Sequence, residues 1–535
     1  MGEQMGAEAE RGTKAPPRTT EADVDARLRA VAERIGVLST RGDWDGMAGF
    51  LGDHWMEAWC ALRPDELARL LSDAPASVFT AGRGGRVLHR ALTLFLPGVP
   101  FAAVDEESAG TADEELGELD AIAVETVSLM RMRESGLAQL AGAGFERLGG
   151  RLARYENGLV DPLGDFGGML RLQAGLAQLA RGDFVAADAW FARAAERTPE
   201  RLFFAQRDAL ANRALLHAAI GTRRTAEEIL ERIPSIPRAS ASWTEDSIDA
   251  SCDVARLLLR LRRGDATALP RDVLSLPWRA IGTAWPLLLW VLAETELQRR
   301  RTEPLLSMVA SVEQMRLPGV DGDGMAGSVI GLCRSIAQRA SGRPVHASAV
   351  APEWLETDVP LARVIRARLR LAEGDAAGAL DIIRRIDERG GHIERVTGAA
   401  NLTAIAAHLQ LEDEASARAV AARLSRDDLA PGYLYLREPR TVALIASMPG
   451  FSDLVPVATG GGAAALADIG ETLTTREREV FGMLMGDISV DEICRRLYVT
   501  RNTVKTHRRN LYRKLGVRSR EQLRAIGLAN PHLWR

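Results

Sequence analysis

The chain of 535 residues is longer than one hydrophobic core usually supports, and its 46% hydrophobic and 26% charged residues are typical of a globular protein. With 5% aromatic residues and abundant Ala, Leu and Arg, the composition favours helices over sheets. The total charge of −4 is uneven, because residues 473–535 hold 14 Lys or Arg against 6 Asp or Glu, a net +8 that leaves −12 for the preceding residues. A small basic module on an acidic body is typical of a local nucleic-acid footprint, although a solvated basic helix would give the same charge.

The use of lysine excludes two functional classes. Only Lys14, Lys505 and Lys514 accompany 65 arginines. A phosphate-binding P-loop needs a lysine after its glycines, and the absence of GK[ST] excludes nucleotide hydrolysis by that route. A phosphoacceptor receiver domain also relies on a lysine, and residues 15–504 contain none. With no nucleophile elbow or metal-ligand spacing either, we expect no enzyme, cofactor or metal site, although folding could still bring carboxylates together.

The cysteines and the apolar segments bear on location. The four cysteines are at least 80 residues apart and have no zinc-like spacing, which predicts reduced core thiols: Cys60, Cys252, Cys333 and Cys494. Residues 1–22 lack an apolar stretch, so we expect a disordered N-terminus that is neither a signal peptide nor an anchor. The longest apolar run, residues 284–293, is about half of a membrane span. We therefore expect a cytoplasmic protein with no membrane partner.

In chain order, helical periodicity starts at residue 23, and no strong strand alternation follows. A recurring motif joins successive amphipathic helices: a charged residue, then Gly-Asp, then the next helix. It occurs as RGDW at 41–44, RGDF at 181–184, RGDA at 263–266 and EGDA at 373–376. The sequence predicts an all-α chain built from helix pairs.

The clearest pair covers residues 172–199. Gly175 lets two helices approach, while Phe184, Ala187, Phe191 and Ala194 place aromatic side chains against small ones on one helical face. Gly182 and Asp183 turn the chain between the helices, and Pro199 ends the second one. This segment resembles the tetratricopeptide repeat, except that Gln178 stands where that repeat usually has an aromatic residue.

Weaker copies keep Gly221, Ala226 and Leu230 in one segment and Ala367, Gly374 and Ala379 in another. Because a helix pair cannot bury its faces alone, we predict a repeat solenoid with a concave surface over residues 23–455, called the body. The Gly- and Ala-rich residues 456–470 are predicted to be a flexible linker. The body is expected to bind a peptide, protein or small-molecule effector, or else to serve as a spacer or dimerisation scaffold.

Residues 471–535, called the head, carry the functional prediction. Three helix starts have capping-box form, Thr474 with Glu477, Ser489 with Glu492 and Ser519 with Gln522, and Thr500 opens a fourth helix that ends at Gly516. Two residues, Tyr498 and Val499, join the second and third helices, which predicts the sharp crossing of a helix-turn-helix. One small core is expected to form from Leu473, Val480, Leu484, Ile493, Leu497, Val504, Leu511 and Leu515.

The helix at 501–515 divides into two faces. Val504, Leu511 and Leu515 face the predicted core, and polar or basic side chains occupy the opposite side at helical spacing. That outer face suits the DNA major groove, where Lys and Arg reach guanine edges and Thr can contact a thymine methyl. The outer face comprises Asn502, Lys505, Thr506, Arg509 and Arg513, and the residues beside it that could hold phosphates are Thr503, His507 and Arg508.

The head resembles the LuxR-type DNA-binding domain, also called the GerE or NarL type. The matching residues are Leu473, Thr474, Arg476, Glu477, Val480, Gly486, Glu492, Ile493, Leu497, Val499, Thr503, Val504, His507, Tyr512, Lys514, Leu515 and Gly516, while Cys494 and Tyr498 depart mildly from the usual Ala and Asn. The resemblance implies that Lys505, Thr506 and Arg509 read bases and that the helix at 519–529 dimerises on DNA. From their positions on and beside the outer face, we expect the backbone or flanking contacts from Arg501, Asn502, Thr503, His507, Arg508 and Arg513.

A helical body joined to such a head is similar to the large regulators of the MalT-like class without their ATPase module. We therefore expect a bacterial, nucleoid-associated, sequence-specific regulator that binds two half-sites of double-stranded DNA as a homodimer and contacts RNA polymerase. An effector on the body would control it. The alternative is an interaction scaffold that sequesters a partner, with the head serving only to localise it. The sequence does not name the effector, the operator, or activation versus repression.

Overall fold

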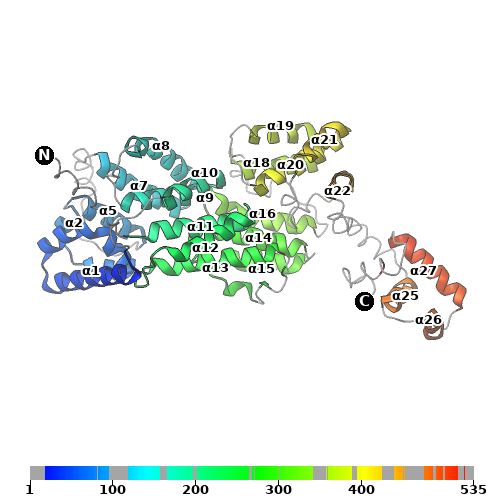
Figure 1. The fold of residues 1–535 in the computed structure, drawn as a ribbon, viewed down its shortest axis with the longest axis horizontal. Helices are drawn as coiled ribbons and strands as arrows, with labels where there is room; N and C mark the ends of the chain where they lie inside the picture. The colour runs from blue at the N-terminus through cyan, green and yellow to red at the C-terminus, as the bar shows by residue number, and fades with distance from the viewer. Residues whose placement is uncertain are drawn as a thin grey trace, which may run out of the picture. The chain divides into compact units, whose positions relative to one another are not determined.

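The structure is a computed structural model, shown in Figure 1. All regular elements in the described part of the chain are helical, as the sequence predicts. The structure describes residues 19–80, 82–95, 118–156, 165–196, 202–263, 265, 268–269, 272–298, 301–340, 357, 359–387, 394–424, 439–449, 451, 475–485, 490–497, 500–515 and 523.

Contacts divide the chain into two compact units, and the division falls within α20 (Glu394–Gln410). Unit 1 covers residues 1–400 with 430–432, and unit 2 covers the rest. The other α-helices of unit 1 are α1 (Glu21–Arg41), α2 (Trp44–Ala61), α3 (Pro64–Leu71), α4 (Ala76–Thr80), α5 (Gly82–Phe95), α7 (Glu118–Glu134), α8 (Ala138–Glu156), α9 (Asp165–Arg181), α10 (Phe184–Glu196), α11 (Phe204–Ala219), α12 (Arg223–Arg232), α13 (Thr244–Arg262), α14 (Trp285–Gln298), α15 (Thr302–Gln314), α16 (Met325–Ala340), α18 (Pro360–Ala372) and α19 (Ala376–Asp387). In unit 2, α21 (Glu414–Ala421) and α22 (Pro439–Ala446) precede the three helices of the head.

The Gly-Asp motif forms the same turn wherever it is described. Gly42, Gly182 and Gly374 have positive φ, which glycine adopts without steric cost, and each ends a helix. The following Asp caps the next helix: the Asp183 carboxylate accepts a hydrogen bond from Ala186 N at 3.1 Å. The turn at Asp413 has the same cap, but Glu412 (φ 59°) stands in the glycine position, so the Gly-Asp pattern does not reveal it.

The α9–α10 pair has the packing that its sequence predicts. The side chains of Ala187, Phe191 and Ala194 are buried, and a Cβ at Gly175 would lie 2.5 Å from the Phe191 ring. Gln178, which departs from the repeat pattern, is also buried and donates a hydrogen bond to the carbonyl of Gly142 on α8 at 3.0 Å. A polar link to the neighbouring helix thus occupies the usual aromatic position.

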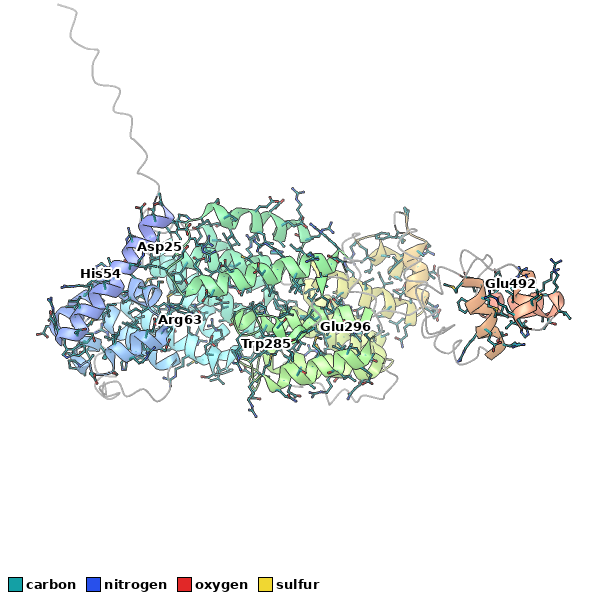
Figure 2. All side chains as sticks on the ribbon, turned by 90° about the horizontal axis from the view of Figure 1, so that it is seen from below. Asp25, His54, Arg63, Trp285, Glu296 and Glu492 are labelled. Atoms are coloured by element: carbon teal, nitrogen blue, oxygen red, sulfur yellow. The ribbon has the colours of Figure 1, made fainter. Side chains whose placement is uncertain are left out.

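Most consecutive helices of unit 1 pack against each other, and α11 packs against α9, α12 and α13 (Figure 1). Contacts between distant segments supplement this stacking. The indole of Trp243 donates to the carbonyl of Trp59 at 2.7 Å, and Arg63, labelled in Figure 2, forms an ion pair with Asp246 at 3.3 Å. These contacts join α2 and the turn that follows it to the start of α13, so segments far apart in the sequence also hold unit 1 together.

Unit 1 buries charged groups between its helices. Arg207 of α11 and Glu245 of α13 form an ion pair of 3.1 Å, with both side chains almost fully buried. Burial raises the pKa of the neighbouring Asp208 carboxyl to about 7, and the charge of Glu245 adds to this effect, whereas Arg133 and a hydrogen bond from Asn212 oppose it.

Helix α1 begins at Glu21, two residues before the start that the sequence periodicity predicts. The helix starts there because Thr20 and Asp23 form a reciprocal capping box. Residues 1–18, the linker and both of its predicted boundaries lie outside the described residues. Three of the four cysteines are buried, as predicted, and Cys494 is partly buried. No described helix is long and apolar enough to cross a membrane.

Candidate nucleic-acid interface

Three helices of the head surround one small core, as the sequence predicts. They are α25 (Thr475–Met485), α26 (Val490–Leu497) and α27 (Arg501–Leu515), and α27 contacts both of the others. Phe481 and Leu523 are fully buried in this core and were missing from the predicted set. Among the described residues, the buried cluster comprises Val480, Phe481, Leu484, Ile493, Leu497, Val504, Leu511 and Leu523, and the predicted core residue Leu473 lies outside them.

Arg476 connects α25 to the end of α26. Its Nη2 donates a hydrogen bond of 2.6 Å to the carbonyl oxygen of Leu497, and its Nη1 donates to Glu479 at 2.7 Å. The Leu497 carbonyl is one of the last acceptors of α26, which lack partners within the helix. Arg476 thus holds the C-terminal end of α26 against α25.

Thr500 begins α27 as predicted. Its hydroxyl accepts a hydrogen bond from Thr503 N at 3.2 Å, and the two threonine hydroxyls lie 2.8 Å apart. Two turns of α27 are anchored in the core by Val504 and Leu511, which are 1% and 0% exposed. The cap and these two anchors fix the rotation of the helix about its axis.

The exposure of the α27 side chains agrees with the predicted faces. Lys505, Thr506 and Arg509 are exposed, as is Arg501 at the first position. Thr503, His507 and Arg508, predicted to flank the outer face, are partly buried. The structure thus places the three predicted base readers together on the solvent side, opposite Val504 and Leu511.

Arg508 differs from Arg509 in its surroundings. Its guanidinium carbon lies 5.9 Å from the centre of the Tyr512 ring, a cation–π geometry that holds the side chain along the helix. On α26, Glu492, labelled in Figure 2, pairs with Arg496 at 3.0 Å and also with Arg495. The carboxylate of Glu492 is therefore directed to the two arginines of its own helix, both of which are exposed.

Part of the predicted site lies outside the described residues. These positions are the capping residues Thr474 and Ser489, the link Tyr498–Val499, and the helix at 519–529 apart from Leu523; of the side chains of Asn502, Arg513 and Leu515 nothing is described.

Residues 471–526 match the family described as bacterial regulatory proteins, luxR family. The match covers α25, α26 and α27. The head is a LuxR-type helix-turn-helix domain. The sequence-based prediction of this domain is confirmed, whereas the tetratricopeptide-like character of the body stays a prediction.

Curated relatives share only the LuxR-type head. The chain is 44% identical over 63 residues to the CsgBAC operon transcriptional regulatory protein of Escherichia coli, which is 12% of this chain and 28% of that protein. It is 48% identical over 50 residues to the HTH-type transcriptional regulator MalT of Yersinia pestis, which is 9% of this chain and 6% of MalT. No solved structure matches the chain.

Proposed function

We propose that this protein is a sequence-specific regulator of transcription that binds double-stranded DNA through α27. One observation carries the proposal: α27 presents Lys505, Thr506 and Arg509 to solvent while Val504 and Leu511 anchor its other face in the core of the LuxR-type head. A rigidly mounted helix with a basic outer face is the element that enters the major groove in helix-turn-helix proteins.

The residues of α27 divide into two roles. Lys505, Thr506 and Arg509 contact base edges and so determine sequence preference. Arg508 contacts phosphates, because its position beside Tyr512 directs it along the flank of the helix. The remaining phosphate-contacting residues of the proposal are Arg501, Asn502, Thr503, His507 and Arg513.

Two copies bind two half-sites, with the helix at 519–529 as the dimer contact on DNA and RNA polymerase as a further partner. An effector on the body changes the distance between the two heads and thereby the affinity for the operator. The protein acts in the cytoplasm, associated with the nucleoid, and has no enzymatic activity of its own. Both curated relatives named above are transcriptional regulators, which supports the assignment.

The test selects binding sites from random duplex DNA with the intact protein. The intact chain should enrich a two-part motif, and a variant with Lys505, Thr506 and Arg509 all changed to Ala should enrich none. A matched variant replaces Arg495, Arg496 and Arg478, which are exposed on the other two helices of the head, and should retain the motif. If both variants lose it equally, α27 is not the reading helix; if the intact protein enriches nothing, the scaffold alternative gains support.

A further inference from the structure

A cleft of about 280 Å³ lies in unit 1, between α5 and the second half of α7. Arg90 of α5 and Arg131 of α7 line it together with the apolar side chains of Val127, Met132 and Leu137, and two serines complete the lining.

The apolar side chains at the cleft are unusually exposed. Among the described residues, only six large hydrophobic side chains are exposed, and three of them fall within residues 132–140. Met132 and Leu137, which line the cleft, are 38% and 43% exposed, and Leu140 in the first turn of α8 is 59% exposed. Single exposed apolar side chains need no explanation, but a group of them beside a cleft is typical of a binding surface.

The turn that presents Leu137 is held by a distant segment. The carbonyl of Gly136 accepts a hydrogen bond from Asp323 N at 3.0 Å, and the Asp323 carboxylate accepts one from Gln139 N at 3.1 Å. A Cβ at Gly136 would lie 2.9 Å from Gly322, so the two backbones are in close contact. Leu137 is therefore exposed on a fixed backbone, which lowers the entropy cost of binding.

The cleft is positive although the chain before the head carries an excess of acidic residues. None of the described residues that line it carries a carboxylate. Two acidic side chains of α7 pair with arginines outside the cleft: Glu125 with Arg151 and Glu134 with Arg133, both at 2.5 Å. Within the described residues, Arg131 is exposed and forms no ion pair.

We propose that this cleft binds a segment of a partner protein in which an Asp or Glu is flanked by apolar residues. The carboxylate meets Arg131, and the apolar residues cover Met132, Leu137 and Leu140. Arg90, which donates to Ser128 Oγ at 3.4 Å, adds positive charge at the α5 side. Charge complementarity selects an acidic segment over a neutral or basic one. This partner segment would be the effector of the proposed function, and the cleft its binding site. A regulatory role of the cleft therefore rests on the proposed function.

The test uses the full-length protein and a phage-displayed library of random 12-residue peptides. Arg131→Glu and Leu137→Ser alter the cleft, and Arg29→Glu and Leu274→Ser make the same changes at exposed positions outside it. All four substitutions are at the surface, so each variant should fold. Thermal unfolding of each variant is the check.

We expect the wild-type protein to enrich peptides with Asp or Glu beside apolar residues. Synthetic copies should bind both control variants as they bind the wild type, and both cleft variants at least tenfold more weakly. Peptides without acidic residues, peptides that bind all four variants equally, or no enrichment would each overturn the proposal. So would a wild-type dimer in sedimentation that Leu137→Ser dissociates, because the occupant would then be a second copy of the chain.

Binding of the four variants to the selected DNA motif is measured in parallel without peptide. Because the head is unchanged, all four should bind DNA normally. If the protein binds the peptides but no DNA motif, the result contradicts the proposed function and leaves the cleft proposal standing. If it binds the DNA motif but no peptides, the result contradicts the cleft proposal alone.

Discussion

The guanidinium of Arg476 donates a 2.6 Å hydrogen bond to the carbonyl oxygen of Leu497, the last residue of α26. This bond joins the two helices that precede α27 and holds the C-terminal end of α26. We therefore predict that Arg476 affects DNA binding through the position of α27.

Replacing Arg476 with Ala should lower affinity for all DNA sequences while preserving base preference, because the reading side chains remain. A hydrogen bond to a charged group contributes about 1.5–3 kcal/mol, and the stability of the head should fall by a comparable amount. Glu479→Gln is the matched control, since it removes the ion pair at 2.7 Å and keeps the bond to Leu497. Calorimetry and DNA titration should show the larger loss for Arg476→Ala; an equal loss in both variants would assign the effect to the ion pair.

Arg508 and Arg509 are adjacent, but their replacement by Ala should affect DNA binding in different ways. Arg509→Ala should relax preference at one base position by about 1–3 kcal/mol, whereas Arg508→Ala should weaken binding to every sequence and reduce the salt slope by about one. Titrations of specific and random duplexes at several salt concentrations distinguish these effects. Equal losses on both duplexes for both variants would contradict the assignment of faces on α27.

Phe481 should be indispensable for the head. Replacing a buried Phe with Ala costs about 3–5 kcal/mol, and a single core of fewer than about 70–80 residues supplies about that much stability. Phe481→Ala should therefore unfold the head and abolish DNA binding while the body still unfolds at its normal temperature. Met483→Ala, at the edge of the same core, should leave the head folded. A folded head in the Phe481 variant would show that α25 contributes less to the core than its burial indicates.

Two glycines in unit 1 should respond oppositely to Ala. At Gly175 the added methyl would lie 2.5 Å from the buried Phe191 ring, which predicts a destabilisation of about 1–3 kcal/mol. At Gly150 on α8 a Cβ meets nothing within 4 Å, so the better helix propensity of Ala should stabilise by about 0.5–1 kcal/mol. Chemical unfolding of both variants measures the difference, and a stabilising Gly175→Ala would refute the close helix contact.

Asp208 should make the stability of the body depend on pH. Its folded pKa of about 7 exceeds the ordinary 3.8, so between about pH 4 and 7 the folded state keeps a proton that the unfolded state releases. The stability contributed by this group is present below pH 4 and is lost as the pH rises through 7, with a slope of at most about 1.4 kcal/mol per pH unit. Asp208→Asn keeps the acceptor for Asn212 and should remove this slope; an unchanged slope in unfolding experiments would exclude Asp208 as its source.

The sequence predicted local features well because they depend on nearby residues. The turns at Gly42, Gly182 and Gly374 follow from backbone freedom and Asp capping, and the faces of α27 follow from helical spacing. The turn at Glu412 was missed because a non-glycine residue adopts the positive φ there.

Features that depend on tertiary structure were not predictable in this way. The contact of Trp59 with Trp243 and the cleft between α5 and α7 join segments whose proximity no local pattern encodes. Phe481 was missed because it directly follows Val480. Helical spacing predicted only Val480 on the buried face, whereas both side chains are buried.

The role of α27 is tested most directly by measuring genome-wide binding of the intact protein beside the variant in which Lys505, Thr506 and Arg509 are all Ala. If α27 reads the operator, the intact protein gives discrete peaks that share one two-part motif, and these peaks disappear in the variant while the variant remains folded and equally abundant. Peaks that persist unchanged in the variant would contradict the claim that α27 reads the operator.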